Sequence, residues 1–264
     1  MKFLTFQAKD YKRAIQEAYT VLEQDPHYYP MHRWLAWAYF EEGDFQKSFE
    51  MSGLFFKHAG NRPIYASDYE YYAKAASKIG NVEAAVTNYK KVLELDSTRT
   101  EVHDFIAKAY YENKNWQEAE KAYVTKIASG KTTNQDWYYL GMAQYQQNKN
   151  AEADSTFAKL TEKQPTYATG WMMRARANNR LDPDRVNYLA KPFYEKYIEL
   201  ASADPEKYKK QLVEAYNFIG YYASQHEDLP GAIVWYEKSV ALDPANEEAV
   251  GALKQLKEIT GGKK

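Results

Sequence analysis

The sequence of 264 residues contains no cysteine. This absence excludes a disulfide framework, a thiolate metal site and a cysteine nucleophile. An excess of charge of either sign is also lacking, because 35 Lys and Arg face 36 Asp and Glu, for a formal net charge of -1. Proteins that bind nucleic acid through its phosphates carry a basic excess or a basic stripe. We therefore expect no nucleic acid among the partners.

Long hydrophobic runs are missing as well. No apolar stretch approaches the roughly 18 residues that span a bilayer, so we expect no direct membrane insertion. The apolar start of the chain is too short for a secretory signal. Aromatic residues, in contrast, are abundant, with 25 Tyr, 11 Phe and 6 Trp. Tyr and Trp suit both cores and surfaces that are apolar in body and polar at the tip, so composition does not say what they contact.

A pattern recurs along the chain. Ala66, Thr100, Asn134 and Ala168 lie 34 residues apart, and each begins a pair of amphipathic segments with apolar residues at helical spacing. The eighth and twentieth positions of the units are always Ala, Gly or Ser. They are Ala36, Ala73, Ala107, Gly141, Ala175 and Gly220, and Ala14, Ser48, Ala85, Ala119, Ala153, Ala190 and Ala232. Two helices cross closely only where both carry small side chains, so each unit is predicted to contain one such crossing.

Large residues stand beside these small ones. The fourth position carries His32, Tyr69, His103, Trp137, Trp171 and Tyr216, and the twenty-fourth carries Tyr89, Tyr123, Phe157, Tyr194 and Tyr236. Between the paired segments fall Gly43, Gly80 and Asn148, which tolerate the left-handed conformation just past a helix end. Proline closes several units, because it cannot continue the preceding helix.

These positions resemble the tetratricopeptide repeat family, whose repeats carry an aromatic, Leu and Gly or Ala in the first helix and Ala and an aromatic in the second. The resemblance covers nearly the whole chain. It implies an all-α fold, a right-handed superhelical solenoid of helix–turn–helix repeats. The Tyr-, Asn- and Lys-rich composition is also similar to that of exported bacterial members. Arg174, Lys126, Ala18 and Ser52 depart from the family pattern, and we expect looser packing around them.

We predict a single solenoid over residues 1–260. Its parts are a partial unit at 1–28, full units at 29–65, 66–99, 100–133, 134–167, 168–204 and 205–246, and a cap helix at 247–259. Residues 261–264 are predicted to be a disordered tail. A cap closes the last apolar face of such an array. The other end has no cap, since the count places Met1 in the middle of a first helix, and we therefore expect the chain to be a fragment of a longer protein.

Sequence motifs typical of catalysis or metal binding are incomplete in this chain. The Gly130-Lys131-Thr132 segment lacks the earlier Gly of a phosphate-binding loop, since Thr125 stands there, and no strand leads into it. Asp182-Pro183-Asp184 begins like a calcium loop, but Asn187 and Phe193 occupy the required Gly and Glu positions. No pair of histidines has the spacing of a shared metal site. We therefore predict no catalytic residue, no metal and no cofactor.

The resemblance also implies a binding surface, because in this family the first helices of successive repeats line a concave face. The implied ligand-groove residues are Arg33, Trp34, Trp37, Phe40, Tyr71, Lys74, Phe105, Lys108, Tyr111, Tyr138, Tyr139, Met142, Tyr145 and Arg176. Glu41, Lys78, Glu112 and Arg180 fall on the same face. Together they form an aromatic trough with scattered cations. Many of these rings could equally bridge adjacent helices, half buried.

The carboxylate clamp through which some family members bind acidic chaperone tails is not retained. At its positions the chain carries Arg33, Trp37, Tyr71, Glu101 and Phe105. Only the first charge is kept, and Glu101 would repel a carboxylate. We therefore expect no binding of chaperone tails, and a ligand that is not acidic.

The favoured function is a non-catalytic protein–protein interaction scaffold that binds a peptide or partner segment in the aromatic groove. One alternative is a carbohydrate-binding or glycan-uptake accessory module, because Tyr and Trp faces stack on sugar rings. Another is the assembly or regulatory part of a larger protein whose chemistry lies elsewhere.

Overall fold

The computed structural model describes residues 9–130 and 132–261, and these residues form α-helices joined by short loops, without a strand. The predicted all-α helical-repeat fold is confirmed. The chain divides into two compact units, Met1–Gly130 and Lys131–Lys264. We refer to them as the N-terminal and the C-terminal unit.

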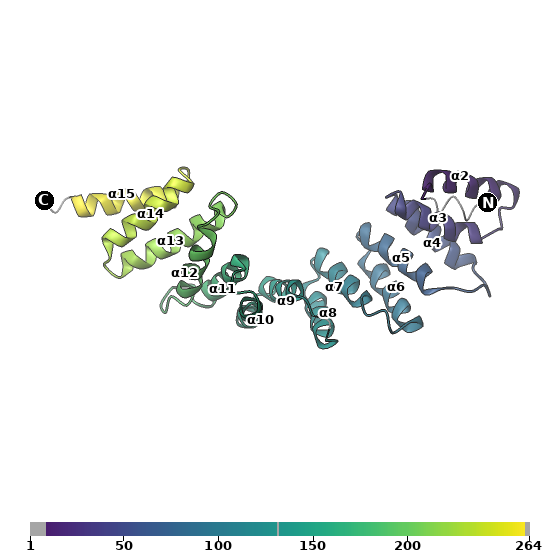
Figure 1. Ribbon diagram of the computed structural model, residues 1–264, viewed down its shortest axis with the longest axis horizontal. Helices are drawn as coiled ribbons and strands as arrows, with labels where there is room; N and C mark the ends of the chain where they lie inside the picture. The colour runs from purple at the N-terminus through teal and green to yellow at the C-terminus, as the bar shows by residue number, and fades with distance from the viewer. Residues whose placement is uncertain (1–8, 131, 262–264) are drawn as a thin grey trace. The chain divides into compact units, whose positions relative to one another are not determined.

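In the N-terminal unit each helix packs against the next one along the chain (Figure 1). Its described helices are α2 (Tyr11–Gln24), α3 (Pro30–Glu41), α4 (Phe45–His58), α5 (Ala66–Lys78), α6 (Val82–Leu95), α7 (Val102–Glu112) and α8 (Trp116–Ala128). In addition α3 contacts α5, so first helices of neighbouring hairpins touch directly. This contact brings two predicted binding helices side by side.

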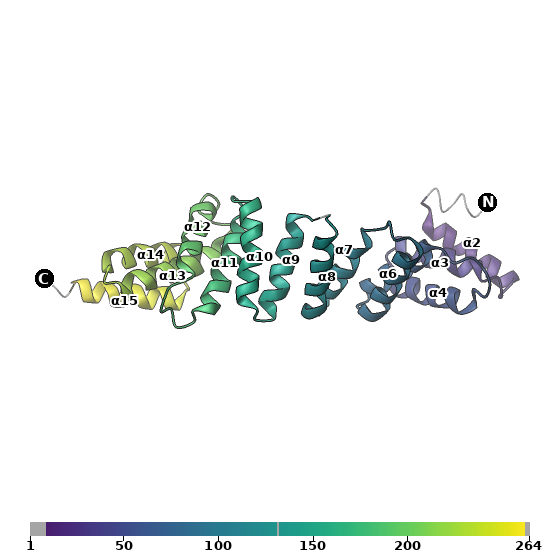
Figure 2. The same ribbon diagram turned by 90° about the horizontal axis from the view of Figure 1, so that it is seen from below.

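The C-terminal unit has the same construction (Figure 2). Its described helices are α9 (Asn134–Gln146), α10 (Asn150–Lys163), α11 (Ala168–Leu181), α12 (Lys191–Ala201), α13 (Lys209–Gln225), α14 (Leu229–Leu242) and α15 (Glu247–Gly261). The paired helices α9 and α10 pack against each other, as do α13 and α14.

The small residues of the repeat lie at the helix crossings. Ala73 and Ala85, at the eighth and twentieth positions of one unit, are completely buried. Where the eighth position is Gly141, the ring of Phe157 fills the space, and a Cβ there would lie 2.6 Å from that ring. Ser48 is buried too, and its hydroxyl donates to the carbonyl of Ala36 at 2.8 Å. The small side chains thus allow the close approach that their spacing predicted.

The turns between paired helices have the predicted left-handed residue. Gly43, Gly80 and Asn148 have φ values of 83°, 79° and 60°. The next residue often caps the following helix, as where the Asn81 side chain accepts from the amide of Ala84 at 3.1 Å. Lys114 takes the same left-handed conformation with φ 60°, although lysine rarely adopts it.

Two of the residues that depart from the repeat pattern are compensated by charge pairs. Arg174 lies 2.8 Å from the carboxylate of Asp154, and its guanidinium is 4.2 Å from the centre of the Phe193 ring. Lys126 is buried and pairs with Asp104 at 2.7 Å. These contacts give each charged group a partner in place of the apolar contacts of the usual residues, and the looser packing expected there stays a prediction.

The loop between α11 and α12 is organised by one buried carboxylate. Asp182 accepts hydrogen bonds from the amides of Val186, Asn187 and Leu189, at 2.9, 3.0 and 3.3 Å. The carboxylate is thus used to hold the backbone of the loop, which agrees with its interpretation as an insertion loop and not a calcium loop.

The predicted boundaries of the repeats and the single solenoid remain predictions. The residues expected in the partial first unit fall partly outside the described residues, as do residues 262–264 of the expected tail. The last helix continues to Gly261. Among the described residues, no helix combines the length and apolarity that would allow it to cross a membrane.

Candidate functional site

Three aromatic rings meet on neighbouring first helices of the N-terminal unit. The rings of Trp37 on α3 and Tyr71 on α5 stack with centroids 5.3 Å apart. Phe40 meets the same Tyr71 edge-on at 5.5 Å. All three are half-buried, so each presents part of its ring to solvent. We call Trp37, Phe40 and Tyr71 the aromatic triad.

The triad is fixed by a polar contact at its edge. The Tyr71 hydroxyl donates to the carboxylate of Glu41 at 3.0 Å. Burial raises the pKa of Tyr71, and the adjacent carboxylate raises it further, so the phenol stays protonated and remains a donor. The ring is therefore held in one orientation between α3 and α5.

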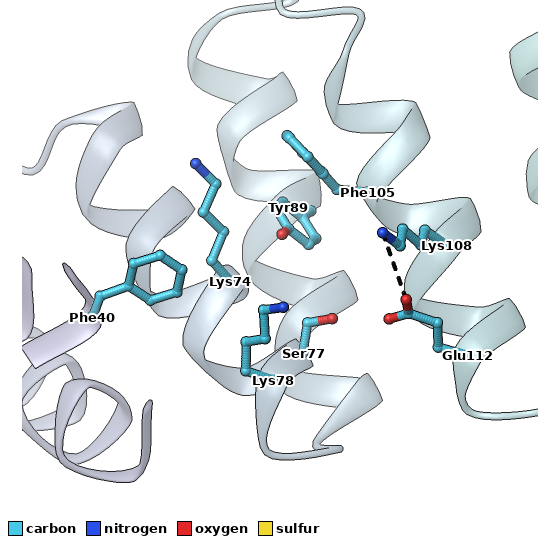
Figure 3. Close-up of a pocket in the computed structure, with 8 residues that line it drawn as sticks. All are labelled: Phe40, Lys74, Ser77, Lys78, Tyr89, Phe105, Lys108 and Glu112. Atoms are coloured by element: carbon cyan, nitrogen blue, oxygen red, sulfur yellow. Dashed lines mark ion pairs between the residues drawn. The ribbon is translucent and has the colours of Figure 1, made fainter. Parts of the chain in front are cut away.

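A pocket of about 240 Å³ opens next to the triad, between α3, α5, α6 and α7 (Figure 3). Its lining residues are Phe40, Lys74, Ser77, Lys78, Tyr89, Phe105, Lys108 and Glu112. The rings of Tyr89 and Phe105 stack at 5.4 Å and form one wall. The pocket thus combines aromatic walls with three amines and two hydroxyls.

The ion pairs around the pocket are unequal. Lys74 lies 2.6 Å from Glu70, but Arg99 also binds that carboxylate at 2.9 Å. Lys108 reaches Glu112 only at 3.6 Å. Lys78 makes no ion pair within the described part of the chain, and its amine lies 5.7 Å from the centre of the Phe45 ring. Positive charge on the pocket wall therefore exceeds negative charge.

Three predicted groove residues of this unit lie outside the pocket, although Trp34 meets Trp37 of the triad edge-on at 5.2 Å. The Arg33 guanidinium pairs with the buried carboxylate of Asp68 at 2.7 Å and donates to the carbonyl of Pro63 at 2.6 Å. Trp34 packs on the core that α2 and α3 share. Tyr111 lies edge-on to Trp116 of α8 at 5.3 Å. None of the three lines the pocket.

In the C-terminal unit most predicted residues pack inward. Tyr138, Met142 and Tyr145 lie against a core cluster that includes Phe157 and Leu160. The Tyr145 ring is also covered by the guanidinium of Arg180, 3.6 Å from its centre. These side chains mainly bridge helices, which is the alternative that the sequence left open.

Arg176 of α11 is likewise bound within the chain. Its guanidinium reaches the carboxylate of Glu214 on α13 at 2.6 Å, and the Tyr194 hydroxyl donates to the same carboxylate at 2.9 Å. Burial and this carboxylate raise the pKa of Tyr194. Tyr139 accepts a hydrogen bond from Gln135 at 2.9 Å and is half-buried.

Two pocket residues were missed by the sequence reasoning. Ser77 follows Lys74 by one helical turn and so shares its face, a signal that the sequence did contain. Tyr89 occupies the twenty-fourth position, where an aromatic is explained by packing alone, and it is only 2% exposed. Its hydroxyl nevertheless faces the pocket in Figure 3. Of the polar residues here, only this one lies on a second helix.

No cluster of three or more His, Asp or Glu side chains suited to a metal occurs among the residues that the structure describes. The arrangement can bind a ligand through ring faces, amines and hydroxyls.

Three segments match models of the tetratricopeptide repeat, at residues 5–48, 71–99 and 137–167. Among solved structures, the C-terminal part of a TPR repeat-containing protein from Cytophaga hutchinsonii is similar over 96% of this chain and 98% of its own. Its identity is 29% and its TM-score 0.77. YrrB, described as a TPR protein with an unusual peptide-binding site, matches 80% of this chain and 97% of its own, with 18% identity and a TM-score of 0.54. No curated protein matches the sequence.

Proposed function

Because this chain belongs to the tetratricopeptide repeat family, we propose that it is a non-catalytic scaffold that binds a peptide or partner segment across α3, α5 and α7. Repeats of this family commonly mediate protein–protein interaction. The observation that carries the proposal is the aromatic triad together with the pocket that continues from it. Both lie in the N-terminal unit and share Phe40.

The physical properties of this surface suit a peptide. Aromatic side chains lose little conformational entropy on binding and are enriched among residues that dominate interface energies. The triad is ordered beforehand by ring packing and by the bond from Tyr71 to Glu41, so little further ordering is needed on association. An adjoining pocket can then take one anchor side chain.

The proposal is tested by selecting peptides from a random twelve-residue library displayed on phage, with the whole chain as bait. Affinities of the selected peptides are then measured by calorimetry for the chain and for Trp37→Ala. We expect Trp37→Ala to weaken binding at least tenfold, because hot-spot truncation costs about 2 kcal/mol or more. Helix content by circular dichroism should be unchanged.

The matched control is Phe56→Ala. Phe56 is also half-buried, but it lies on second helix α4, where its ring packs on Tyr69 at 4.6 Å. Equal weakening by both variants would show that lost stability, and not a lost contact, explains the effect. Selected peptides that bind Trp37→Ala as tightly as the parent would rule out this surface.

The carbohydrate alternative has less support. Sugar binding uses free aromatic faces, whereas Trp37 and Tyr71 stack on each other.

A further inference from the structure

The pocket beside the triad has an uncompensated positive charge. Three lysine amines line it, from Lys74 and Lys78 on α5 and Lys108 on α7, against the single carboxylate of Glu112. Figure 3 shows the amines of Lys78 and Lys108 directed toward a common space, whereas the amine of Lys74 points away from them. The wall therefore carries a formal excess of two positive charges.

The surrounding contacts leave part of this charge available. Glu70 does not line the pocket. It pairs with Lys74 at 2.6 Å and with Arg99, which also pairs with Glu101 at 2.7 Å, so Lys74 is the least available of the three amines. The pair of Lys108 and Glu112 is long, at 3.6 Å, and both side chains are largely exposed. Such an exposed ion pair contributes little free energy, so Lys108 can readily pair with the carboxylate of a ligand instead. Lys78 has no carboxylate partner in the described chain.

The aromatic rings and hydroxyls of the pocket further restrict the kind of ligand that fits it. Phe40 forms one wall, and Phe105, stacked on Tyr89, forms another. The hydroxyls of Ser77 and Tyr89 can donate to an anion, and burial raises the pKa of Tyr89, so that hydroxyl keeps its proton. An anion attached to an apolar body is complementary to such a site.

We infer that the pocket takes an acidic side chain, Asp or Glu, of the bound segment, with an apolar neighbouring group against Phe40 and Phe105. This inference rests on the proposed function and specifies which side chains of the bound segment enter the pocket. It differs from the family's carboxylate clamp, whose positions in these repeats hold Tyr71, Glu101 and Phe105. It also replaces the expectation from the sequence that the ligand is not acidic.

A carboxylate on a phenyl group is a minimal probe of this arrangement. We would titrate the whole ¹⁵N-labelled chain with 3-phenylpropanoate and, separately, with the uncharged 3-phenylpropanamide, and follow amide signals by NMR. The expected result is that the carboxylate shifts signals of α5 and α7 with at least fivefold higher affinity than the amide. Raising the salt concentration should weaken the binding of the carboxylate probe but not that of the amide probe, because salt screens the attraction between charges. Equal affinities, or shifts elsewhere, would overturn the inference.

Variants locate the effect. Lys78→Gln should weaken the binding of 3-phenylpropanoate about fivefold and leave the affinity for 3-phenylpropanamide unchanged. Lys57→Gln, which removes an exposed lysine of α4 outside the pocket, should change neither. If Lys57→Gln weakened the carboxylate as much as Lys78→Gln does, the attraction would be the general charge of the chain and the inference would be wrong.

A peptide test separates this inference from the proposed function. Each selected peptide is remade with its acidic residues changed to Asn or Gln. We expect at least one such change to weaken binding about fivefold in the parent chain and much less in Lys78→Gln. Peptides that need Trp37 but tolerate every neutral replacement would overturn the inference and leave the scaffold proposal standing. Carboxylate-selective probe binding without any peptide binding would contradict both.

Discussion

Arg33 and Asp68 form a two-point ion pair between α3 and α5. Arg33 Nε lies 2.7 Å from Asp68 Oδ1, and Nη2 donates to Oδ2 at 2.8 Å. The carboxylate is almost completely buried and also accepts from the amide of Tyr65 at 2.8 Å, at the start of α5. A residue predicted to contact ligand thus joins the two helices that carry the aromatic triad.

Replacing Asp68 by Ala should therefore destabilise the N-terminal unit. The substitution leaves the mostly buried guanidinium of Arg33 without its charge partner. It also leaves the amide of Tyr65 without its hydrogen-bond acceptor. We expect the free energy of unfolding in urea to fall by about 3 kcal/mol. In the double variant Arg33→Met, Asp68→Asn the loss of stability should be smaller than the sum of the losses in Arg33→Met alone and in Asp68→Asn alone. An additive result would mean that the pair contributes no coupling.

The close crossing at Gly141 gives a second prediction. Alanine normally stabilises a helix relative to glycine, but a Cβ at Gly141 would lie 2.6 Å from the Phe157 ring. We expect Gly141→Ala to lower the free energy of unfolding by about 1–3 kcal/mol. The matched control is Gly251→Ala in α15, where no atom lies within 4 Å of the new Cβ. That change should stabilise by about 0.5–1 kcal/mol, and a stabilising effect at both sites would refute the packing argument.

The ion pairs of Glu70 should make its contribution to the free energy of unfolding depend on pH. Burial alone would raise the pKa of Glu70, but hydrogen bonds from Arg99 and Lys74 outweigh it and hold the pKa below 4.5. A lowered folded-state pKa gives stability that is present above the unfolded-state value and is lost as the pH falls through the folded-state value. We expect Glu70→Gln to be less stable by about 1 kcal/mol at pH 7. This difference should shrink as the pH falls below 4.5 in urea titrations, and a constant difference would contradict the account.

The strained turn at Lys114 gives a fourth prediction. Its left-handed conformation, with φ 60°, is unfavourable for lysine by roughly 1–2 kcal/mol. Glycine adopts it freely but loses more entropy on folding, so Lys114→Gly should stabilise by up to about 1 kcal/mol. Lys121→Gly in the middle of α8 should instead destabilise by about 1 kcal/mol. Loss of stability in both variants would show that the turn is not strained.

The fold was largely predictable, because small residues at fixed spacing have one physical explanation. Ala73 and Ala85 are completely buried, and at Gly141 a Cβ would lie 2.6 Å from the Phe157 ring, so small residues are needed where the helices cross. The turns at Gly43 and Gly80 were predictable for the same reason, since the left-handed conformation selects glycine.

The site was only partly predictable, because position on a helix face does not fix a side chain's partners. Arg33 and Arg176 lie at groove positions, yet Asp68 and Glu214 bind them. These acids are distant in sequence, and nothing in the local pattern pairs them. Tyr89 was missed for a related reason, since a residue that fills a core position can still direct its hydroxyl into a pocket.

We propose above that a partner segment binds across α3, α5 and α7. The most direct measurement is an NMR footprint of the tightest selected peptide on the ¹⁵N-labelled chain, with side-chain signals of Trp indoles observed separately. We expect the largest shifts on Trp37, Tyr71 and Phe105, smaller shifts around Tyr89 of α6, and little change in α4 and α8. A footprint centred on those second helices, or confined to the C-terminal unit, would contradict it.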